Sequence, residues 1–181
     1  KYEHTLIIYM TDNGAAFPGS KTTLYDAGMR LPFIIKSPGG KFAGTVSDAL
    51  VSWVDIAPTV LDFAGAPVET AAFHGKSIRP VLGENSPADW RDEVYASHTF
   101  HEVTTYYPMR VLRTKKYKFI WNLAHGLSHP FSGDLWASAA WRPVREGRTD
   151  VFGARTVEAY LHRPVFELYD IENDPNEVNN L

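Results

Sequence analysis

The chain has 181 residues, of which 44% are hydrophobic and 13% aromatic, enough to build a core for one domain or one and a half. Its 18 basic and 21 acidic residues are spread along the sequence and give a formal charge of −3, which excludes a polycation that coats nucleic acid. The absence of cysteine excludes disulfides and thiolate chemistry, and no apolar run approaches the roughly 18 residues that span a bilayer, so no membrane partner is expected.

The first part of the chain combines short apolar runs with turns and helices. Residues 5–10 and 31–35 are rich in β-branched and aromatic side chains, which is typical of strands buried on both faces of a parallel sheet. A helix is expected from Asp55, which can cap its first turn, to about Ala64, because Gly65 then supplies a C-terminal stop. These elements indicate an α/β domain.

A turn-rich stretch at 84–87 follows a second, shorter helix that is expected to begin after Ser77. Stretches of this composition commonly connect domains. We therefore expect a first domain over residues 1–84 and a second over residues 85–181.

The second domain is expected to be a smaller α+β unit built on an antiparallel sheet. Its predicted strands cover residues 93–96, 109–113, 117–121 and 165–169. The tight turn 114–116 joins the middle two as a hairpin. Most of 125–155 lacks periodicity and is expected to be a long ordered loop, with one helix at 135–141. The closing stretch 170–175 suits Asx-type turns.

The first apolar run stops at Asp12-Asn13-Gly14, a tripeptide that allows two interpretations. Asn-Gly is a strong signal for a two-residue β-hairpin. A hairpin needs an alternating partner strand directly afterwards, whereas residues 15–20 contain proline and glycine and do not alternate. We therefore expect the chain to leave the sheet at this point.

Asp12 and Asn13 then occupy the position after a strand from which side chains reach a ligand. A carboxylate and an amide carbonyl both offer oxygen, which suits Ca²⁺ or Mg²⁺ better than a softer metal, and Gly14 would let the backbone turn sharply so that both residues point at one ion. Calcium takes about six to eight oxygens, so the other ligands must come from elsewhere. Lys21 could pair with an oxyanion at this site, although a single lysine is more often a solvated surface residue.

The chain resembles the sulfatase family, within the alkaline-phosphatase-like superfamily, over the stretch TDNGAAFPGSKTTLYDAGMRLPFIIKSPG at residues 11–39. In that family a strand ends in Asp-Asn-Gly and a basic residue follows. The likeness continues through VSWVDIAPTVLDFAGAP, HGKSIRPVLGE and FELYDIENDPNEVNNL. The stretch HTFHEVTTYYPMRVLRTKKYKFIWNL is similar more narrowly to the sulfamidases, the heparan N-sulfatase branch.

The resemblance implies a fold and a set of site residues. The first domain would be the C-terminal part of a sulfatase-type mixed sheet with flanking helices. Asp12 and Asn13 would supply part of a Ca²⁺ shell, with Mg²⁺ less expected, and Lys21 would be the catalytic residue that binds the sulfate oxygens. His101 and Glu102 would face the sugar of the substrate, and the alternative interpretation for these two is an exposed loop pair.

One departure from the family concerns the nucleophile. Sulfatases attack with a formylglycine made from the first residue of a Cys/Ser-x-Pro-x-Arg motif, which this chain does not contain. The expectation is therefore a C-terminal fragment of a longer enzyme, inactive alone, that pairs with its missing N-terminal half or forms a homodimer. Its substrate would be a sulfate ester or N-sulfamate of a sulfated sugar, such as N-sulfoglucosamine.

Two other function classes stay open at this point. One is a phosphatase or phosphodiesterase of the same superfamily, which would use two transition metals and more histidine ligands. The other is a non-catalytic module that binds sulfated glycans. The resemblance places a bacterial enzyme in the periplasm or outside the cell, and an animal enzyme in the lysosome.

Overall fold

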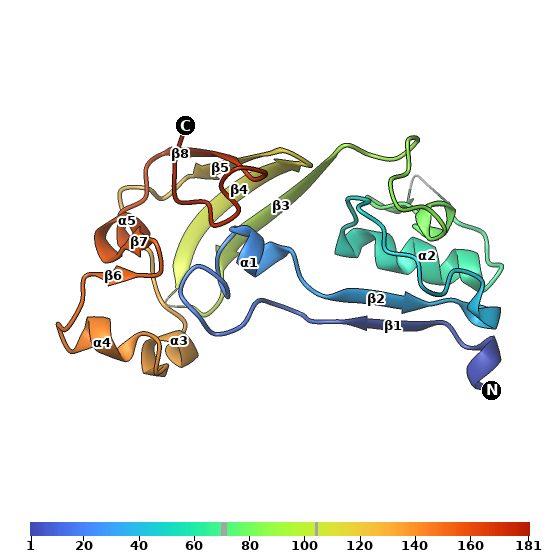
Figure 1. The fold of residues 1–181 in the computed structure, drawn as a ribbon, viewed down its shortest axis with the longest axis horizontal. Helices are drawn as coiled ribbons and strands as arrows, with labels where there is room; N and C mark the ends of the chain where they lie inside the picture. Colours follow the sequence, from blue (N-terminus) through green and yellow to red (C-terminus); the bar gives the residue numbers. More distant parts are fainter. Residues whose placement is uncertain (70–71, 104) are drawn as a thin grey trace. The chain divides into compact units, whose positions relative to one another are not determined.

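The computed structural model of the chain describes residues 1–69, 72–103 and 105–181. The chain forms two compact units (Figure 1). The first unit contains residues 1–10 and 33–94, and the second contains residues 11–32 and 95–181. The fold is a mixed α/β one, with antiparallel sheets and few helices, as the sequence predicts.

The predicted division into domains at 84–87 stays a prediction. The two compact units differ from it in where they place one segment. The segment 11–32, which carries the Asp-Asn-Gly turn and Lys21, belongs to the same compact unit as the later sheet. The chain therefore leaves the first unit after Met10 and returns to it at Phe33.

The first unit holds a two-stranded sheet made by β1, Ile7–Met10, and β2, Phe33–Lys36. The two strands pair antiparallel, with Ile7 opposite Lys36. The expectation of a parallel sheet buried on both faces is therefore wrong. An apolar run carries no information about strand direction. In the described part of the chain these two strands pair only with each other, and Tyr9 and Ile34 are 61% and 62% exposed.

Helix α2, Ile56–Phe63, confirms the predicted helix, and Gly65 ends it with a φ of +69°. The predicted cap is wrong, because the Asp55 side chain makes no capping bond to this helix. Instead Asp55 accepts a hydrogen bond of 2.8 Å from the backbone N–H of Ser52, in a capping box around the 3-10 helix η3, Trp53–Asp55. Further 3-10 helices among the described residues of this unit include η1 at Tyr2–His4, η2 at Pro38–Gly40 and η5 at Arg79–Val81.

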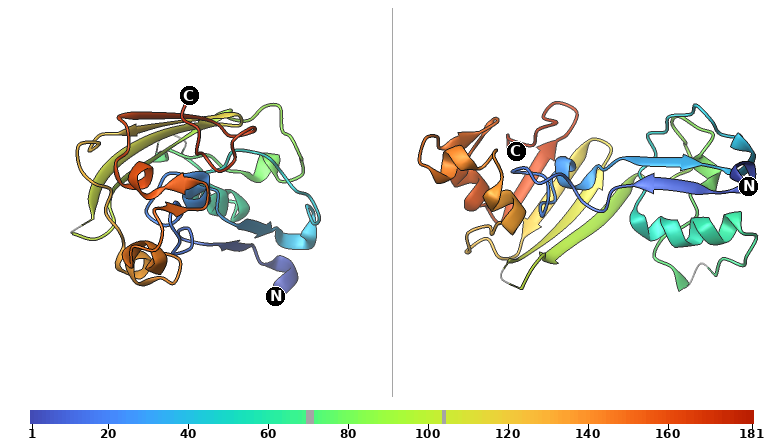
Figure 2. Two further views of the ribbon diagram at one scale, coloured as in Figure 1. Left: turned by 60° about the vertical axis from the view of Figure 1, so that its left-hand side comes forward. Right: turned by 90° about the horizontal axis from the view of Figure 1, so that it is seen from below.

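The second unit is built on a four-stranded sheet with the order β3-β4-β5-β8 (Figures 1 and 2). Its strands are β3 at Glu93–Phe100, β4 at Tyr106–Thr114, β5 at Tyr117–Asn122 and β8 at Phe166–Asp170. Strand β5 pairs antiparallel with both β4 and β8. The four predicted strands and the hairpin between β4 and β5 are confirmed.

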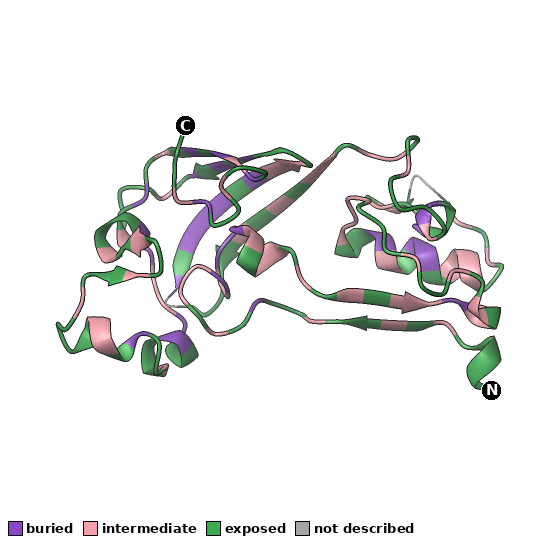
Figure 3. Cartoon of the chain, in the orientation of Figure 1, coloured by how far each residue is buried: buried purple, intermediate pink, exposed green. Residues whose placement is uncertain are grey.

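The hydrophobic core of this unit lies on one face of the sheet, and Figure 3 shows buried positions along β4. The segment after Lys21 contributes Leu24 and Tyr25, and the residue after β8, Ile171, completes the cluster. Its sheet members are Tyr107, Met109, Val111, Ile120 and Tyr169. This packing fixes the segment 11–32 against the sheet.

Short elements fill the rest of the second unit. They are α1 at Asp26–Met29, α3 at Gly133–Ala137, α4 at Arg142–Arg145, β6 at Val151–Phe152, β7 at Arg155–Thr156 and α5 at Val157–Leu161. The single helix predicted at 135–141 is therefore wrong in extent, because two shorter helices lie on either side of 138–141. No helix in the described ranges is long and apolar enough to cross a membrane.

Candidate functional site

Asp12 and Asn13 follow the carboxyl end of β1, as expected, and both are exposed. No hydrogen bond or ion pair joins either side chain to another described residue. A carboxylate and an amide oxygen that stay free of protein partners fit a hard cation such as Ca²⁺. The described residues contain no cluster of three or more His, Cys, Asp or Glu that could hold a metal by itself.

Gly14 is needed for close packing. Its φ is not positive, so the sharp turn expected of it is not of the left-handed kind. A Cβ added to Gly14 would lie 2.3 Å from Ser20 Oγ and 2.7 Å from the Ala27 carbonyl oxygen. Glycine therefore lets the Asp-Asn turn lie directly against the loop that carries Lys21.

The Lys21 loop is held by its own backbone. The Lys21 N–H donates to the Ala15 carbonyl at 3.1 Å, and the Ser20 hydroxyl donates to the Ala27 carbonyl at 2.8 Å. The next residue, Thr22, has a φ of +66°, which a β-branched residue rarely adopts. The turn at 21–22 is therefore a strained one that the surrounding structure must maintain.

The Lys21 side chain has a partner that the sequence did not predict. Its ammonium lies 2.6 Å from Oδ2 of Asp134, at the start of α3 and 113 residues away along the chain. The Lys21 side chain is 18% exposed and that of Asp134 45%. The hydrogen bond from Lys21 lowers the pKa of Asp134 to about 2, so this carboxylate is charged at neutral pH.

A buried histidine lies next to the same turn. His129 is 2% exposed and packs edge-on against the rings of Tyr107 and Tyr160, with ring centroids 4.9 and 5.3 Å away. Burial holds the pKa of His129 well below its ordinary value, and Arg163 adds to this effect. The imidazole is therefore neutral at neutral pH.

His101 and Glu102 follow β3 and form a turn. The backbone N–H groups of both residues donate to Thr105 Oγ1, at 3.1 and 2.6 Å. His101 Nε2 lies 4.0 Å from Glu102 Oε1, and the two side chains are 36% and 55% exposed. No hydrogen bond or ion pair joins them to Asp12 or Lys21 among the described residues, so their predicted role toward a sugar stays a prediction.

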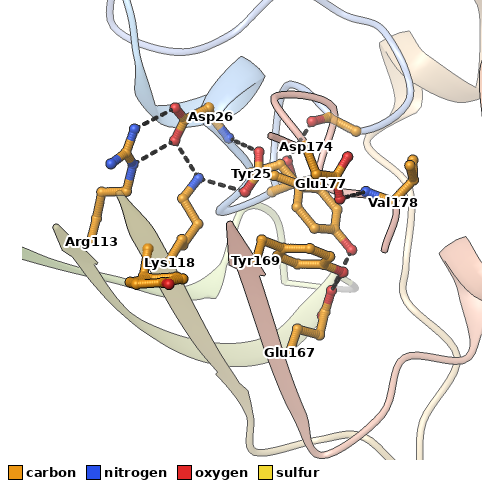
Figure 4. A network of polar contacts seen from close by, with 12 residues as sticks. Tyr25, Asp26, Arg113, Lys118, Glu167, Tyr169, Asp174, Glu177 and Val178 are labelled. Carbon is orange, nitrogen blue, oxygen red and sulfur yellow. Dashed lines mark hydrogen bonds and ion pairs between the residues drawn. The ribbon is translucent and has the colours of Figure 1, made fainter. Parts of the chain in front are cut away.

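A largely buried network of charged side chains surrounds Lys118 (Figure 4). Asp26, at the start of α1, lies 3.0 Å from the Arg113 guanidinium and 2.5 Å from the Lys118 ammonium. Lys118 is fully buried and also lies 2.7 Å from Glu177. Burial alone would raise the pKa of Asp26, but Arg113 and Lys118 together lower it to about 2.

A second buried carboxylate extends this arrangement. Glu167 accepts hydrogen bonds from the hydroxyls of Tyr25 and Tyr169, at 2.8 and 2.5 Å (Figure 4), and from the Asn122 amide at 2.6 Å. Burial raises the pKa of both tyrosines, so the hydroxyls keep their protons and donate. Tyr25 lies four residues after Lys21, and these contacts fix the loop to the sheet.

Comparisons with known proteins agree on one family. The family model described as N-sulphoglucosamine sulphohydrolase, C-terminal, matches residues 19–126. The chain is 33% identical to N-sulphoglucosamine sulphohydrolase of Homo sapiens, over 98% of this chain and 37% of that protein. The chain spans about a third of the length of the curated relatives it matches.

Two solved structures show the same fold. One is a protein in complex with its substrate D-glucosamine-2-N,6-O-disulfate, which matches with a TM-score of 0.63 at 27% identity, over 97% of this chain and 29% of that chain. The other is a phosphonate monoester hydrolase from Silicibacter pomeroyi, with a TM-score of 0.54 at 27% identity, over 67% of this chain and 27% of that chain.

Proposed function

The chain belongs to the sulfatase family, and from this premise we propose that it supplies the C-terminal part of a hydrolase that removes sulfate from sulfated sugars, with an N-sulfoglucosamine-like residue as substrate. One observation carries the proposal. The side-chain oxygens of Asp12 and Asn13 are exposed, have no partner among the residues that the structure describes, and lie directly after β1, and the loop that follows them carries Lys21. The relative named for N-sulphoglucosamine and the structural neighbour with a glucosamine disulfate support this substrate class.

The side-chain oxygens in the turn after β1 are of the type that calcium prefers, but two residues supply only part of its coordination shell. Asp12 and Asn13 would hold the ion by their side-chain oxygens, and other parts of the enzyme would complete the shell. A bound calcium ion would neutralise negative charge on the sulfate oxygens. Magnesium fits less well, because it demands closer and more regular ligand geometry.

Lys21 has the role of oxyanion binder in this proposal. Its ammonium carries three N–H donors, of which one points to Asp134, so that two can donate to sulfate oxygens. Charge that builds up on these oxygens during transfer is stabilised by a cation that is already in place. His101 and Glu102 would hydrogen-bond the sugar hydroxyls or amine from their exposed turn.

The nucleophile of the enzyme lies outside this chain in our proposal. No Cys/Ser-x-Pro-x-Arg motif occurs in its sequence, so the isolated chain is expected to be inactive. We expect the coding region that precedes this segment to encode that motif together with paired aspartates. We place the enzyme in the periplasm or outside a bacterial cell, or in the lysosome of an animal cell.

The test is a lysine substitution in the full-length enzyme. Lys21→Ala is expected to lower turnover of an N-sulfated glucosamine by roughly 100-fold or more, the usual effect of losing an oxyanion donor. Lys41→Ala, at an exposed lysine of the first unit, serves as the control and should leave turnover unchanged. A near-normal rate in the Lys21 variant would contradict the proposal.

The similarity to a phosphonate monoester hydrolase favours a second candidate, the hydrolysis of phosphate or phosphonate esters. Metal content separates the two candidates. A purified enzyme with one calcium per chain that cleaves sulfated sugar would support the sulfatase proposal. Two transition-metal ions per chain and a preference for phosphonate esters would support the second candidate.

A further inference from the structure

A residue from the segment after β5 contacts the Lys21 side chain. Asp134 forms the ion pair with the Lys21 ammonium at 2.6 Å. It lies in the first turn of α3.

Asp134 is itself fixed in orientation. Its Oδ1 accepts the backbone N–H of Leu135 at 2.9 Å, so the other oxygen, Oδ2, faces Lys21. A lysine side chain carries large rotamer freedom, which a fixed carboxylate at 2.6 Å removes before any ligand arrives.

We propose that Asp134 is a positioning residue that holds the Lys21 ammonium in the direction required to bind a substrate's sulfate group. The inference rests on the proposed function of Lys21. It assigns Asp134, which the sequence indicated only as part of a loop, to the sulfate-binding site. Asp134 fixes the end of the lysine side chain.

If the contact between Lys21 and Asp134 were an ordinary surface ion pair, removal of the carboxylate would leave kcat/KM unchanged, because such pairs contribute little. A carboxylate that competes with sulfate for the ammonium would give the opposite result, because its removal would improve substrate binding. Kinetic measurements on the full-length enzyme separate these three cases.

The first experiment replaces Asp134 by its neutral isostere. In the full-length enzyme, Asp134→Asn is expected to lower kcat/KM for an N-sulfated glucosamine about 10- to 100-fold, the usual effect of a misdirected catalytic group. The melting temperature should change by less than about 2 °C, because the carboxylate is partly exposed. An unchanged or increased kcat/KM would overturn the proposal.

The matched control is Glu158→Gln. Glu158 is also an acidic residue in the first turn of a short helix, α5, but its side chain is 82% exposed and faces His162 at 4.0 Å. This variant should keep the kcat/KM of the parent enzyme. The difference between the two variants then reports the contact with Lys21 and not the loss of a charge near a helix start.

The second experiment repeats Asp134→Asn in the Lys21→Ala background. Positioning predicts no further loss of the residual kcat/KM, because Asp134 acts only through Lys21. An equal loss in both backgrounds would overturn the inference while leaving the role of Lys21 intact. A Lys21→Ala enzyme of normal activity would instead defeat the proposed function.

Discussion

Two groups of polar side chains in the second unit differ in whether their members have hydrogen-bond or ion-pair partners within the described chain. Around Lys118, buried carboxylates and cations lie within 2.5 to 3.0 Å of one another, and each charge has a partner (Figure 4). Asp12 and Asn13 are exposed, and neither has a hydrogen-bond or ion-pair partner among the described residues. The first group stabilises the fold, whereas the second keeps its oxygens available for a ligand.

This contrast separates charge that is paired within the fold from charge that stays exposed without a partner among the described residues. Taking a charge out of water is costly, so a buried charged group must be paired within the chain. An exposed carboxylate pays no such cost and can stay free until a cation binds. Lys21 is intermediate, since its side chain is mostly buried and is paired with one exposed carboxylate.

The largest effect is expected from breaking the buried group. Lys118→Met keeps the length of the side chain but leaves Glu177 without its cation and Asp26 with only Arg113. The free energy of unfolding should fall by about 3–5 kcal/mol, as measured by chemical denaturation. Lys116→Met, in the exposed hairpin turn, is the control and should change the free energy of unfolding little. A similarly small effect of Lys118→Met would mean that the buried charges contribute nothing to the stability of the fold.

Low pH should weaken the ion pairs that Asp26 makes with Arg113 and Lys118. The folded-state pKa of Asp26 is about 2, below its ordinary value of 3.8, so its contribution is present above pH 3.8 and is lost as the pH falls toward 2. The expected loss is on the order of 2 kcal/mol. Glu177 acts in the opposite sense, because burial raises its pKa and its protonated form is favoured in the fold.

The pH dependence is checked by denaturation between pH 5 and pH 2. Asp26→Asn should remove the part of the slope that lies between pH 3.8 and about 2. A parent-like slope in this variant would show that other carboxylates cause the acid sensitivity.

A smaller loss of stability is expected when the hydroxyl of Tyr25 is removed. Tyr25→Phe removes a hydrogen bond of 2.8 Å to Glu167 and should lower the free energy of unfolding by about 1–2 kcal/mol. Tyr106→Phe, at a tyrosine that is 55% exposed, is the matched control and should have almost no effect. Equal effects of the two substitutions would argue against a structural role for the Glu167 cluster.

The smallest effect on stability is expected at the exposed pair. Asp12→Ala in calcium-free buffer should change the free energy of unfolding by less than about 0.5 kcal/mol, because its side chain has no partner among the described residues. Denaturation curves of parent and variant should therefore coincide. A clear destabilisation would show that Asp12 stabilises the fold, as the charged residues around Lys118 do, and would contradict the difference drawn between the two groups.

Local patterns allowed much of this fold to be predicted. The alternation in residues 117–121 and the short turn before them define a hairpin between neighbours in sequence, and the hairpin is confirmed. The direction of β1 against β2 could not be predicted, since their pairing joins residues 23 to 29 positions apart. The exposed turn with Asp12 and Asn13 was predictable because a strand end and its ligand types are adjacent in the sequence.

Other features depend on contacts that no local pattern records. Lys118 lies in an alternating strand where a buried lysine is unusual, and that position was the available signal for the charged group. Asp134 meets Lys21 across 113 residues, and nothing near either residue indicates the pair. The close packing of Gly14 against Ser20 likewise appears only once the loop is folded.

The most direct test of our account is a calcium titration of the full-length enzyme, compared with its Asp12→Ala and Asn13→Ala variants. Calorimetry should show one calcium ion per chain in the parent, and each variant should bind it at least about tenfold more weakly while unfolding normally without calcium. Equal calcium affinity in the parent and in both variants would contradict the claim that the turn after β1 provides metal ligands.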